Sequence, residues 1–244
     1  MTSPACAVIV SGTGVSGPVA ERYYGRLASA FATHHILALP GLGHGSLALT
    51  RAYVVARIEG LLNRSAVDPA VPVVVIGHSQ GGLLVLEASL TLPRVTAVHA
   101  LAAPLQGLPL LPVLRPLAHG FTWAVKGLAG FLADLIAGSR YLLDLAARLA
   151  RRPDVLRRTT VWAFADDWLV PAGSAYLPGA TNYLYGSAAE YADYRRAYPG
   201  RSEVAHIPRR QGSGGHLTQA RSPDLRDWFA RRYAAAAGPL DATA

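Results

Sequence analysis

The chain has one cysteine, Cys6, among its 244 residues. A single cysteine excludes an intramolecular disulfide and a metal site built from several cysteine ligands. Nothing else in the sequence calls for a metal ion or a cofactor, and we expect neither. Proteins without disulfides are typical of a reducing compartment, so a cytoplasmic location is expected.

Long uninterrupted hydrophobic runs are also missing, although 51% of the residues are hydrophobic and the mean hydropathy is +0.24. The three charge-free windows, 1–20, 69–86 and 95–114, are each broken by glycine, proline or polar residues. A helix that spans a membrane needs about 20 predominantly apolar residues. The first window also lacks the basic segment and the continuous apolar run of a signal peptide. We therefore expect a soluble protein with no transmembrane segment and no export signal.

Acidic residues are scarce relative to basic ones, since 15 Asp and Glu stand against 23 Lys and Arg, for a formal net charge of +8. Lys126 is the only lysine, and the arginines are spread along the chain in pairs such as Arg151-Arg152 and Arg231-Arg232. This dispersal predicts a solvated basic surface, or alternatively a surface that attracts an acidic protein partner or an anionic lipid. Nucleic acid is not an expected partner, because no basic run alternates with aromatic residues.

Strand and helix patterns alternate along most of the chain, which predicts an α/β fold. The predicted strands are short apolar runs, and segments with helical periodicity follow them. We expect strands at 6–11, 36–39, 71–76, 95–101, 160–165 and 203–207. The last helix is expected to begin with Ser222 as its N-cap and Pro223 in its first position. Such alternation gives a mostly parallel central sheet with helices on both faces.

One segment interrupts this alternation. About 55 residues, Pro104–Arg158, separate two strands that a single helix could connect. The segment is rich in leucine and aromatic residues, which predicts a helical lid over an active site; extra helical packing is the alternative. We expect residues 1–103 and 159–244 to form the core and residues 104–158 to form the lid. The side chains expected to line a substrate pocket are Phe121, Trp123, Phe131 and Leu135.

The sequence Gly77-His78-Ser79-Gln80-Gly81-Gly82 lies between the predicted strand at 71–76 and the helix after it. A serine at a sharp strand-to-helix turn adopts a strained backbone conformation, and glycines two residues before and after it relieve the crowding. The turn exposes the serine Oγ, and the first N–H groups of the helix point toward an oxyanion that forms beside it. The motif predicts Ser79 as a nucleophile, whereas the simpler interpretation is a helix N-cap.

A nucleophilic serine needs a base. Of the eight histidines, His216 is the strongest candidate, because it follows the last predicted strand in a glycine-containing loop that can bend back over the sheet. His44 lies in the loop after the second predicted strand, and His78 directly precedes Ser79; we expect His78 to be a packed neighbour. His206 lies within a predicted strand and is expected to be structural.

The base in turn needs an acid that orients it. Asp166 and Asp167 directly follow the strand predicted at 160–165, and a carboxylate there can reach the histidine loop. Both aspartates are candidates on this ground. The order serine, aspartate, histidine along the chain is the one that this architecture requires.

These motifs resemble those of the α/β-hydrolase superfamily, in particular of small lipases, esterases and thioesterases, and the resemblance runs through most of the chain. The Gly77–Gly82 motif resembles the nucleophile elbow, and Gly215-His216-Leu217-Thr218 resembles the histidine loop. The sequence Asp167-Trp168-Leu169-Val170-Pro171 is similar to the family's Asp-x-x-Val-Pro acid segment, which favours the second of the two aspartates. Leu39–Ser46 is similar to a Leu-Pro-Gly-His-Gly-x-Ser loop.

The resemblance implies an oxyanion hole made by the backbone N–H groups of Gln80 and Thr13. The pair Ser11-Gly12 departs from the His-Gly that lipases often carry at this place. An acyl-enzyme on Ser79 that is resolved by water makes an esterase or thioesterase acting on a small molecule, and the apolar insertion favours an apolar or aromatic acyl group. If an alcohol, amine or thiol replaces water, the same triad makes an acyltransferase, for which a carrier-protein thioester is a candidate donor. A binding scaffold without catalysis is disfavoured, because all three triad residue types are present.

The turn after the first strand also matches a dinucleotide-binding pattern. Gly12-Thr13-Gly14-Val15-Ser16-Gly17 satisfies Gly-x-Gly-x-x-Gly between a strand and a helix. The second strand, however, ends at Leu39-Pro40 without the acidic residue that would bind the ribose hydroxyl. Lys126 has Thr122 four residues before it, so it does not complete a Tyr-x-x-x-Lys pair. An NAD(P)-binding oxidoreductase is therefore the lower-ranked alternative.

Overall fold

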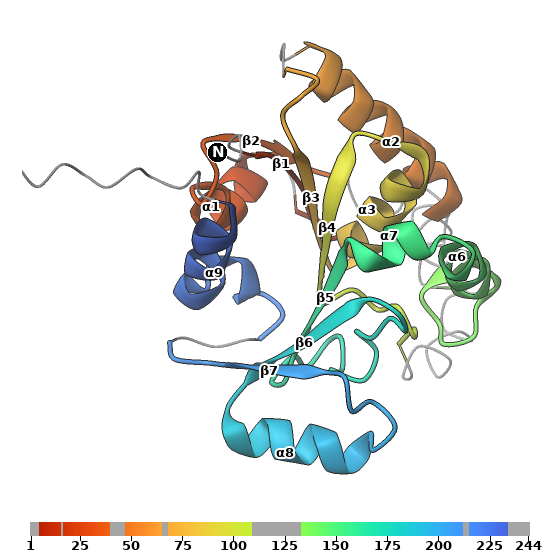
Figure 1. Ribbon diagram of the computed structural model, residues 1–244, viewed down its shortest axis with the longest axis vertical. Coiled ribbons are helices and arrows are strands. Elements are labelled where there is room, and N and C mark those ends of the chain that lie inside the picture. Colours follow the sequence, from red (N-terminus) through yellow and green to blue (C-terminus); the bar gives the residue numbers. More distant parts are fainter. Residues whose placement is uncertain are drawn as a thin grey trace, which may run out of the picture.

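Seven parallel strands form one continuous sheet in the computed structural model of the chain (Figure 1). The structure describes residues 5–15, 17–39, 47–64, 68–108, 133–211 and 215–233. Within these residues the strand order is β2-β1-β3-β4-β5-β6-β7. The strands are β1 (Cys6–Val10), β2 (Thr33–Leu37), β3 (Val73–His78), β4 (Val95–Leu101), β5 (Thr159–Phe164), β6 (Thr181–Gly186) and β7 (Ala205–Pro208).

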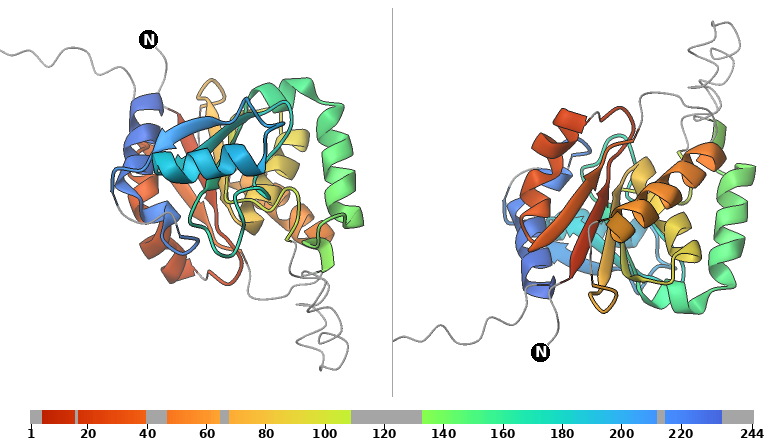
Figure 2. Two further views of the ribbon diagram at one scale, coloured as in Figure 1. Left: turned by 90° about the horizontal axis from the view of Figure 1, so that it is seen from below. Right: turned by 90° about the horizontal axis from the view of Figure 1, so that it is seen from above.

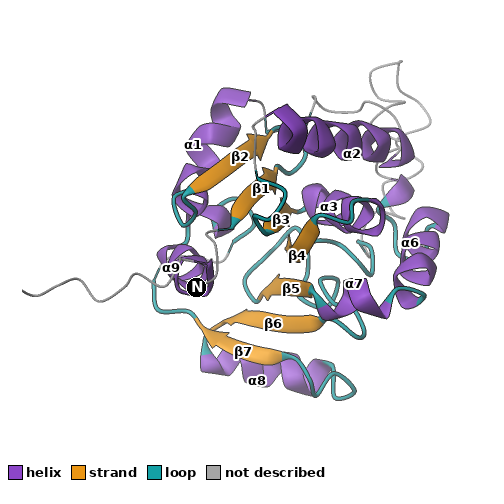
Figure 3. Cartoon of the chain, turned by 45° about the horizontal axis from the view of Figure 1, so that its top comes forward, coloured by secondary structure: helices purple, strands orange, loops and turns teal. Residues whose placement is uncertain are grey.

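Helices cover both faces of this sheet (Figure 3). On one face, α1 (Gly17–Ala28) and α9 (Pro223–Tyr233) lie side by side, although they come from opposite ends of the chain (Figure 2). The elements that pack toward the other face are α2 (Leu47–Arg64), α3 (Gln80–Thr91), α6 (Arg140–Ala150), α7 (Pro153–Arg157) and α8 (Ala188–Ala197). The predicted α/β fold class is confirmed. None of the described helices is long and apolar enough to cross a bilayer.

The apolar strands follow from this layering. Every residue of β1 is buried, and its side chains alternate between the two faces. Ile9 packs with the core under α1 and α9, whereas Val8 and Val10 pack with the core under α2 and α3. Because both faces are covered, each position of the strand must be apolar. Because the strands are parallel, their carboxyl ends all lie at the same end of the sheet, and a ligand site is expected there.

Two parts of the sheet differ from the sequence prediction. Six strands are predicted, and the described residues form one more. The strand without a prediction is β6, whose polar and aromatic residues, among them Asn182, do not form an apolar run. The Asn182 side chain is buried and forms hydrogen bonds with the backbone of Leu177 and Ala180. A buried position of this strand is therefore occupied by a polar residue. β2 begins at Thr33, earlier than predicted, because it is an edge strand whose first residues face solvent.

The insertion predicted as a lid is described at its two ends only. Phe121, Trp123 and Phe131 lie outside the described residues, and the division into core and lid stays a prediction. At one end, Leu108 forms a bridge with Ile136. The other end contains α6 and α7, so its described part is largely helical.

A buried ion pair attaches α6 to the helix that follows the serine turn. The Glu87 side chain on α3 is 1% exposed, and Arg148 on α6 donates to its two oxygens at 2.5 and 2.7 Å. A bidentate pair of this kind fixes orientation as well as distance. The C-terminal end of the insertion is therefore held against α3, whose first residue directly follows Ser79.

Candidate active site

Ser79 occupies the turn between β3 and α3, with φ of 56° and ψ of −121°. This backbone conformation is strained for a residue with a side chain, and such strain is concentrated at functional sites. The Ser79 N–H donates to the Leu101 carbonyl at the end of β4 over 2.8 Å, which fixes the turn against the sheet. Ser79 occupies the N-cap position of α3, but its side chain makes no capping hydrogen bond to the helix, so it does not act as a side-chain cap.

Glycines make this turn possible by allowing close backbone approach. A Cβ at Gly77 would lie 2.1 Å from the Gly81 carbonyl oxygen, and a Cβ at Gly81 would lie 2.4 Å from the Val10 carbonyl oxygen. No side chain fits at these distances. The glycines two residues before and after Ser79 therefore let α3 start directly against β1 and β3.

Asp167 and His216 lie against each other at the carboxyl ends of their strands. The His216 Nδ1 is 2.8 Å from the Asp167 Oδ2, and both side chains are almost fully buried. The Asp167 Oδ1 accepts hydrogen bonds from the N–H groups of Leu169 and Val170, each at 2.9 Å. Burial raises the pKa of Asp167, but the hydrogen bond and the charge of His216, together with hydrogen bonds from the Val170 N–H and the Gln219 side chain, lower this pKa by more. The carboxylate stays ionised, and an ionised carboxylate can only accept.

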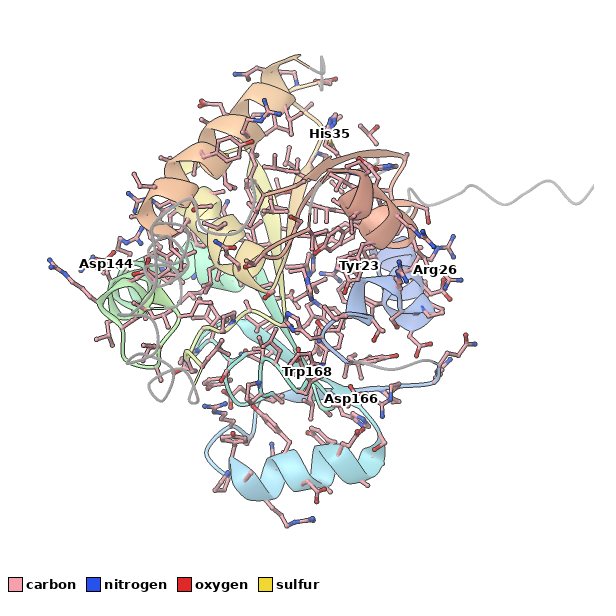
Figure 4. The ribbon with its side chains drawn as sticks, turned by 180° about the vertical axis from the view of Figure 1, so that it is seen from behind. Tyr23, Arg26, His35, Asp144, Asp166 and Trp168 are labelled. Atoms are coloured by element: carbon pink, nitrogen blue, oxygen red, sulfur yellow. The ribbon has the colours of Figure 1, made fainter. Side chains whose placement is uncertain are left out.

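Asp166 has a different partner. Its side chain forms an ion pair with Arg209 at 2.6 Å; Figure 4 labels it on the loop after β5. Of the two aspartates left open by the sequence, the structure thus places Asp167 against His216. His206 is held elsewhere: its Nε2 donates to the Gly186 carbonyl, and its ring stacks on Tyr191. His44 lies outside the described residues.

Ser79 and His216 line one cavity of about 490 Å³. Most of the cavity wall is apolar, and Leu135, which the sequence predicts as a pocket residue, is part of it. Tyr23 of α1, labelled in Figure 4, also lines the cavity and donates its hydroxyl to the His216 carbonyl at 3.1 Å, which anchors the histidine loop. Arg221 is the one formally charged side chain among the described lining residues.

The two predicted oxyanion donors lie next to each other beside Ser79. The Thr13 hydroxyl donates to the Gln80 side-chain oxygen at 2.7 Å, which joins the turn after β1 to the start of α3. Gln80 is the first residue of α3, so its N–H has no carbonyl partner within the helix. A Cβ at Gly12 would lie 3.3 Å from the Ser79 Cβ, so the first glycine of the dinucleotide-like pattern packs against the serine turn.

Two buried polar residues of the site are not indicated by any sequence motif, and a third is predicted only as a packed neighbour. Gln219 donates to the Asp167 carboxylate at 2.6 Å. His78 is buried as predicted, and its ring centre lies 4.8 Å from that of His216. The Tyr24 hydroxyl lies 3.0 Å from the His78 Nδ1. The only sequence signal for Gln219 is its position three residues after the candidate base.

The sequence and the fold were both compared with those of known proteins. A sequence profile described as the alpha/beta hydrolase family matches residues 7–241. The fold is similar to that of Bacillus licheniformis lipase BlEst2, with a TM-score of 0.55 and 16% identity over 73% of this chain and 81% of that one. It is also similar to a Pyrococcus furiosus esterase, with a TM-score of 0.50 and 13% identity over 94% of this chain and 82% of that one.

A metagenomic carboxyl esterase has a TM-score of 0.50 and 20% identity; the match covers 75% of this chain and 63% of the esterase. No curated protein sequence matches the chain. At these identities the structural likeness shows a shared fold alone. The chemistry therefore has to be argued from the residues of the site.

Proposed function

The chain belongs to the alpha/beta hydrolase family, and from this premise we propose that it is a serine acyl hydrolase that forms an acyl-enzyme on Ser79. The observation that carries the proposal is a strained serine and a histidine that line one apolar cavity, with the histidine hydrogen-bonded to a buried aspartate. These are the parts that acyl transfer needs: a nucleophile, a base and a group that orients the base. The substrate class is an ester or a thioester.

In the proposed reaction, His216 removes the Ser79 proton through Nε2 while Oγ attacks the acyl carbonyl. Asp167 keeps the proton of the neutral imidazole on Nδ1 and stabilises the imidazolium that forms. The backbone N–H groups of Thr13 and Gln80 stabilise the oxyanion of the tetrahedral intermediate. His216 then gives its proton to the leaving alcohol or thiol as the acyl carbon–oxygen or carbon–sulfur bond breaks. Water attacks the acyl-enzyme with His216 again as base; the bond between the acyl carbon and Ser79 Oγ then breaks, His216 returns the proton to Oγ, and the carboxylic acid leaves.

The apolar wall of the cavity favours a substrate whose acyl group is apolar and binds inside it. Leu108, Leu135 and Val170 line it close to the catalytic residues. Each CH₂ group buried there contributes about 0.8 kcal/mol, so two more CH₂ groups increase kcat/KM about tenfold. We expect p-nitrophenyl butyrate to exceed p-nitrophenyl acetate by this factor, and the hexanoate to exceed both. Steady-state hydrolysis of the series by the unmodified protein measures it; a flat or acetate-favouring profile would show that the cavity does not bind the acyl chain.

Acyl transfer to an acceptor other than water is the second candidate, and Arg221 favours a donor with an anionic part. Its guanidinium lies 5.5 Å from the centre of the Tyr23 ring at the cavity wall. A carrier-bound or coenzyme-bound thioester carries a phosphate that a cation at this position can attract. The net charge of +8 acts in the same direction on an acidic carrier.

Intact-protein mass spectrometry tests both candidates in one experiment. The protein is mixed with p-nitrophenyl esters or acyl-coenzyme A thioesters and quenched after short times. An acyl adduct that maps to Ser79 and decays in water alone supports the hydrolase. An adduct that persists until an alcohol, amine or thiol is added supports the acyltransferase. An adduct on another residue, with Ser79 unmodified, would disprove the proposed nucleophile.

A further inference from the structure

A continuous line of buried hydrogen bonds runs behind the serine turn, from the acid to the loop after β1. Asp167 Oδ2 accepts from Gln219 Nε2 at 2.6 Å, and Gln219 Oε1 lies 3.2 Å from His78 Nε2. His78 Nδ1 lies 3.0 Å from the Tyr24 hydroxyl. The Tyr24 oxygen in turn accepts the Gly12 N–H at 2.9 Å. The line therefore joins the acid loop, the short 3-10 helix Gln219–Arg221 that follows the histidine loop, β3, α1 and the turn that carries Thr13.

The donor and acceptor at each step follow from the charge of Asp167. An ionised carboxylate only accepts, so Gln219 must present its amide N–H₂ to Asp167 and its oxygen to His78. His78 must then donate from Nε2, which leaves Nδ1 as an acceptor. Tyr24 therefore donates its O–H to His78 Nδ1 and uses its oxygen to accept the Gly12 N–H. With a neutral His78, every bond in the line has one allowed direction.

This arrangement requires a neutral His78, and the surroundings provide it. The His78 side chain is buried against Tyr24 and His216. Burial, followed by the charge of the neighbouring His216, lowers the pKa of His78 to about 3. A protonated His78 would donate from both nitrogens, so the Tyr24 oxygen would have to accept from His78 as well as from the Gly12 N–H, and the Tyr24–His78 bond would be reversed.

We propose that Tyr24, His78 and Gln219 are positioning residues that hold the acid and the oxyanion turn in one fixed relation. This inference rests on the proposed function of Ser79. At one end the line orients Asp167, which orients the base; at the other end it holds Gly12, which directly precedes the oxyanion donor Thr13. Because the three side chains are almost fully buried, water cannot replace a lost partner, and a break at one member disturbs the others.

The chain offers a matched control for a tyrosine–histidine contact away from the site. The Tyr233 hydroxyl on α9 lies 2.6 Å from His99 Nε2 on β4. His99 is buried like His78, and burial also lowers its pKa to about 3. Neither Tyr233 nor His99 lines the cavity. Tyr233→Phe therefore removes the same kind of hydroxyl without touching the line.

A double-mutant cycle tests the coupling between the two ends. Gln219→Met and Tyr24→Phe each keep the size of the side chain, and each is expected to lower kcat for p-nitrophenyl butyrate about tenfold with little change in KM. The double variant is expected to fall about tenfold, not about a hundredfold, because the second change acts on a line that is already broken. Tyr233→Phe combined with Gln219→Met is expected to show independent effects. Independent, multiplicative losses for Tyr24→Phe and Gln219→Met would overturn the proposal.

A pH profile separates positioning from packing. Gln219→Glu keeps the shape of the side chain but places a second carboxylate against Asp167. Neighbouring carboxylates resist joint ionisation, so the acid limb of kcat/KM is expected to move to higher pH, while Gln219→Met lowers the rate with a smaller shift of the limb. An unchanged acid limb in Gln219→Glu would contradict a link between Gln219 and the acid.

Nitrogen-15 NMR of the imidazole rings tests the line without any activity measurement. His78 is expected in the neutral form, with the proton on Nε2 and none on Nδ1, throughout the neutral pH range. A proton on Nδ1, or titration of His78 near neutral pH, would overturn the inference. If His78 has the expected form but Ser79→Ala keeps full activity, the proposed function fails while the hydrogen-bond line stands.

Discussion

Replacing Ser79 or His216 by alanine is expected to lower kcat/KM for the best acyl ester by about 10⁴-fold or more while the protein stays folded. Ser79→Ala removes the atom that attacks the carbonyl, and His216→Ala removes the group that takes its proton. Because the two act as one unit, the double variant is expected to be no slower than the slower single variant. Hydrolysis of p-nitrophenyl butyrate, together with thermal unfolding of each variant, measures both effects.

A buried serine on α3 and a histidine on β7 serve as matched controls. Ser89 is buried on α3, ten residues after Ser79, and its hydroxyl donates to the Leu86 carbonyl within the helix. His206 stacks on Tyr191 at the far edge of the sheet. We expect Ser89→Ala and His206→Ala to keep kcat/KM within about threefold. Full activity in Ser79→Ala would disprove the serine mechanism, and losses in the controls equal to those at the site would point to a general loss of fold.

The sequence predicts those parts of the fold that are determined locally. The residues of β3 and β4 form apolar runs between turn signals, and the structure has strands there. The polar and aromatic residues of β6 carry no such signal, because their burial depends on contacts such as those of Asn182 with the Leu177–Ala180 turn. The start of β2 is missed for a related reason: an edge strand does not need apolar residues on both faces.

In the candidate site too, features formed by residues close together in the sequence can be predicted, and features formed by distant residues cannot. Ser79 and its glycines lie within six residues, so the turn can be predicted from the motif alone. The line behind it cannot, because its members are far apart in the sequence. The bonds Tyr24–His78, His78–Gln219 and Gln219–Asp167 join residues 54, 141 and 52 positions apart. These residues come together only in the folded parallel sheet, which brings the carboxyl ends of its strands to the same end of the sheet.

The choice between the two aspartates is a difference of one residue along the chain, and the sequence without the resemblance leaves it open. Asp167 turns inward and accepts the hydrogen bond of His216, whereas Asp166 turns toward Arg209. Both are carboxylates on the same loop, so exchanging each for asparagine compares the same chemical change at two neighbouring positions.

Asp167→Asn is expected to lower kcat about 10³- to 10⁴-fold, because an amide in place of the carboxylate no longer keeps the His216 proton on Nδ1 and no longer stabilises the imidazolium. Asp166→Asn breaks the partly exposed ion pair with Arg209, and the same arginine also contacts Glu190, so we expect kcat to change less than about threefold. Rates with p-nitrophenyl butyrate and the unfolding temperature of both variants measure the difference. If Asp166→Asn is inactive while Asp167→Asn keeps its rate, then the hydrogen bond between Asp167 and His216 is not the one that orients the base, and the acid of the reaction is its neighbour.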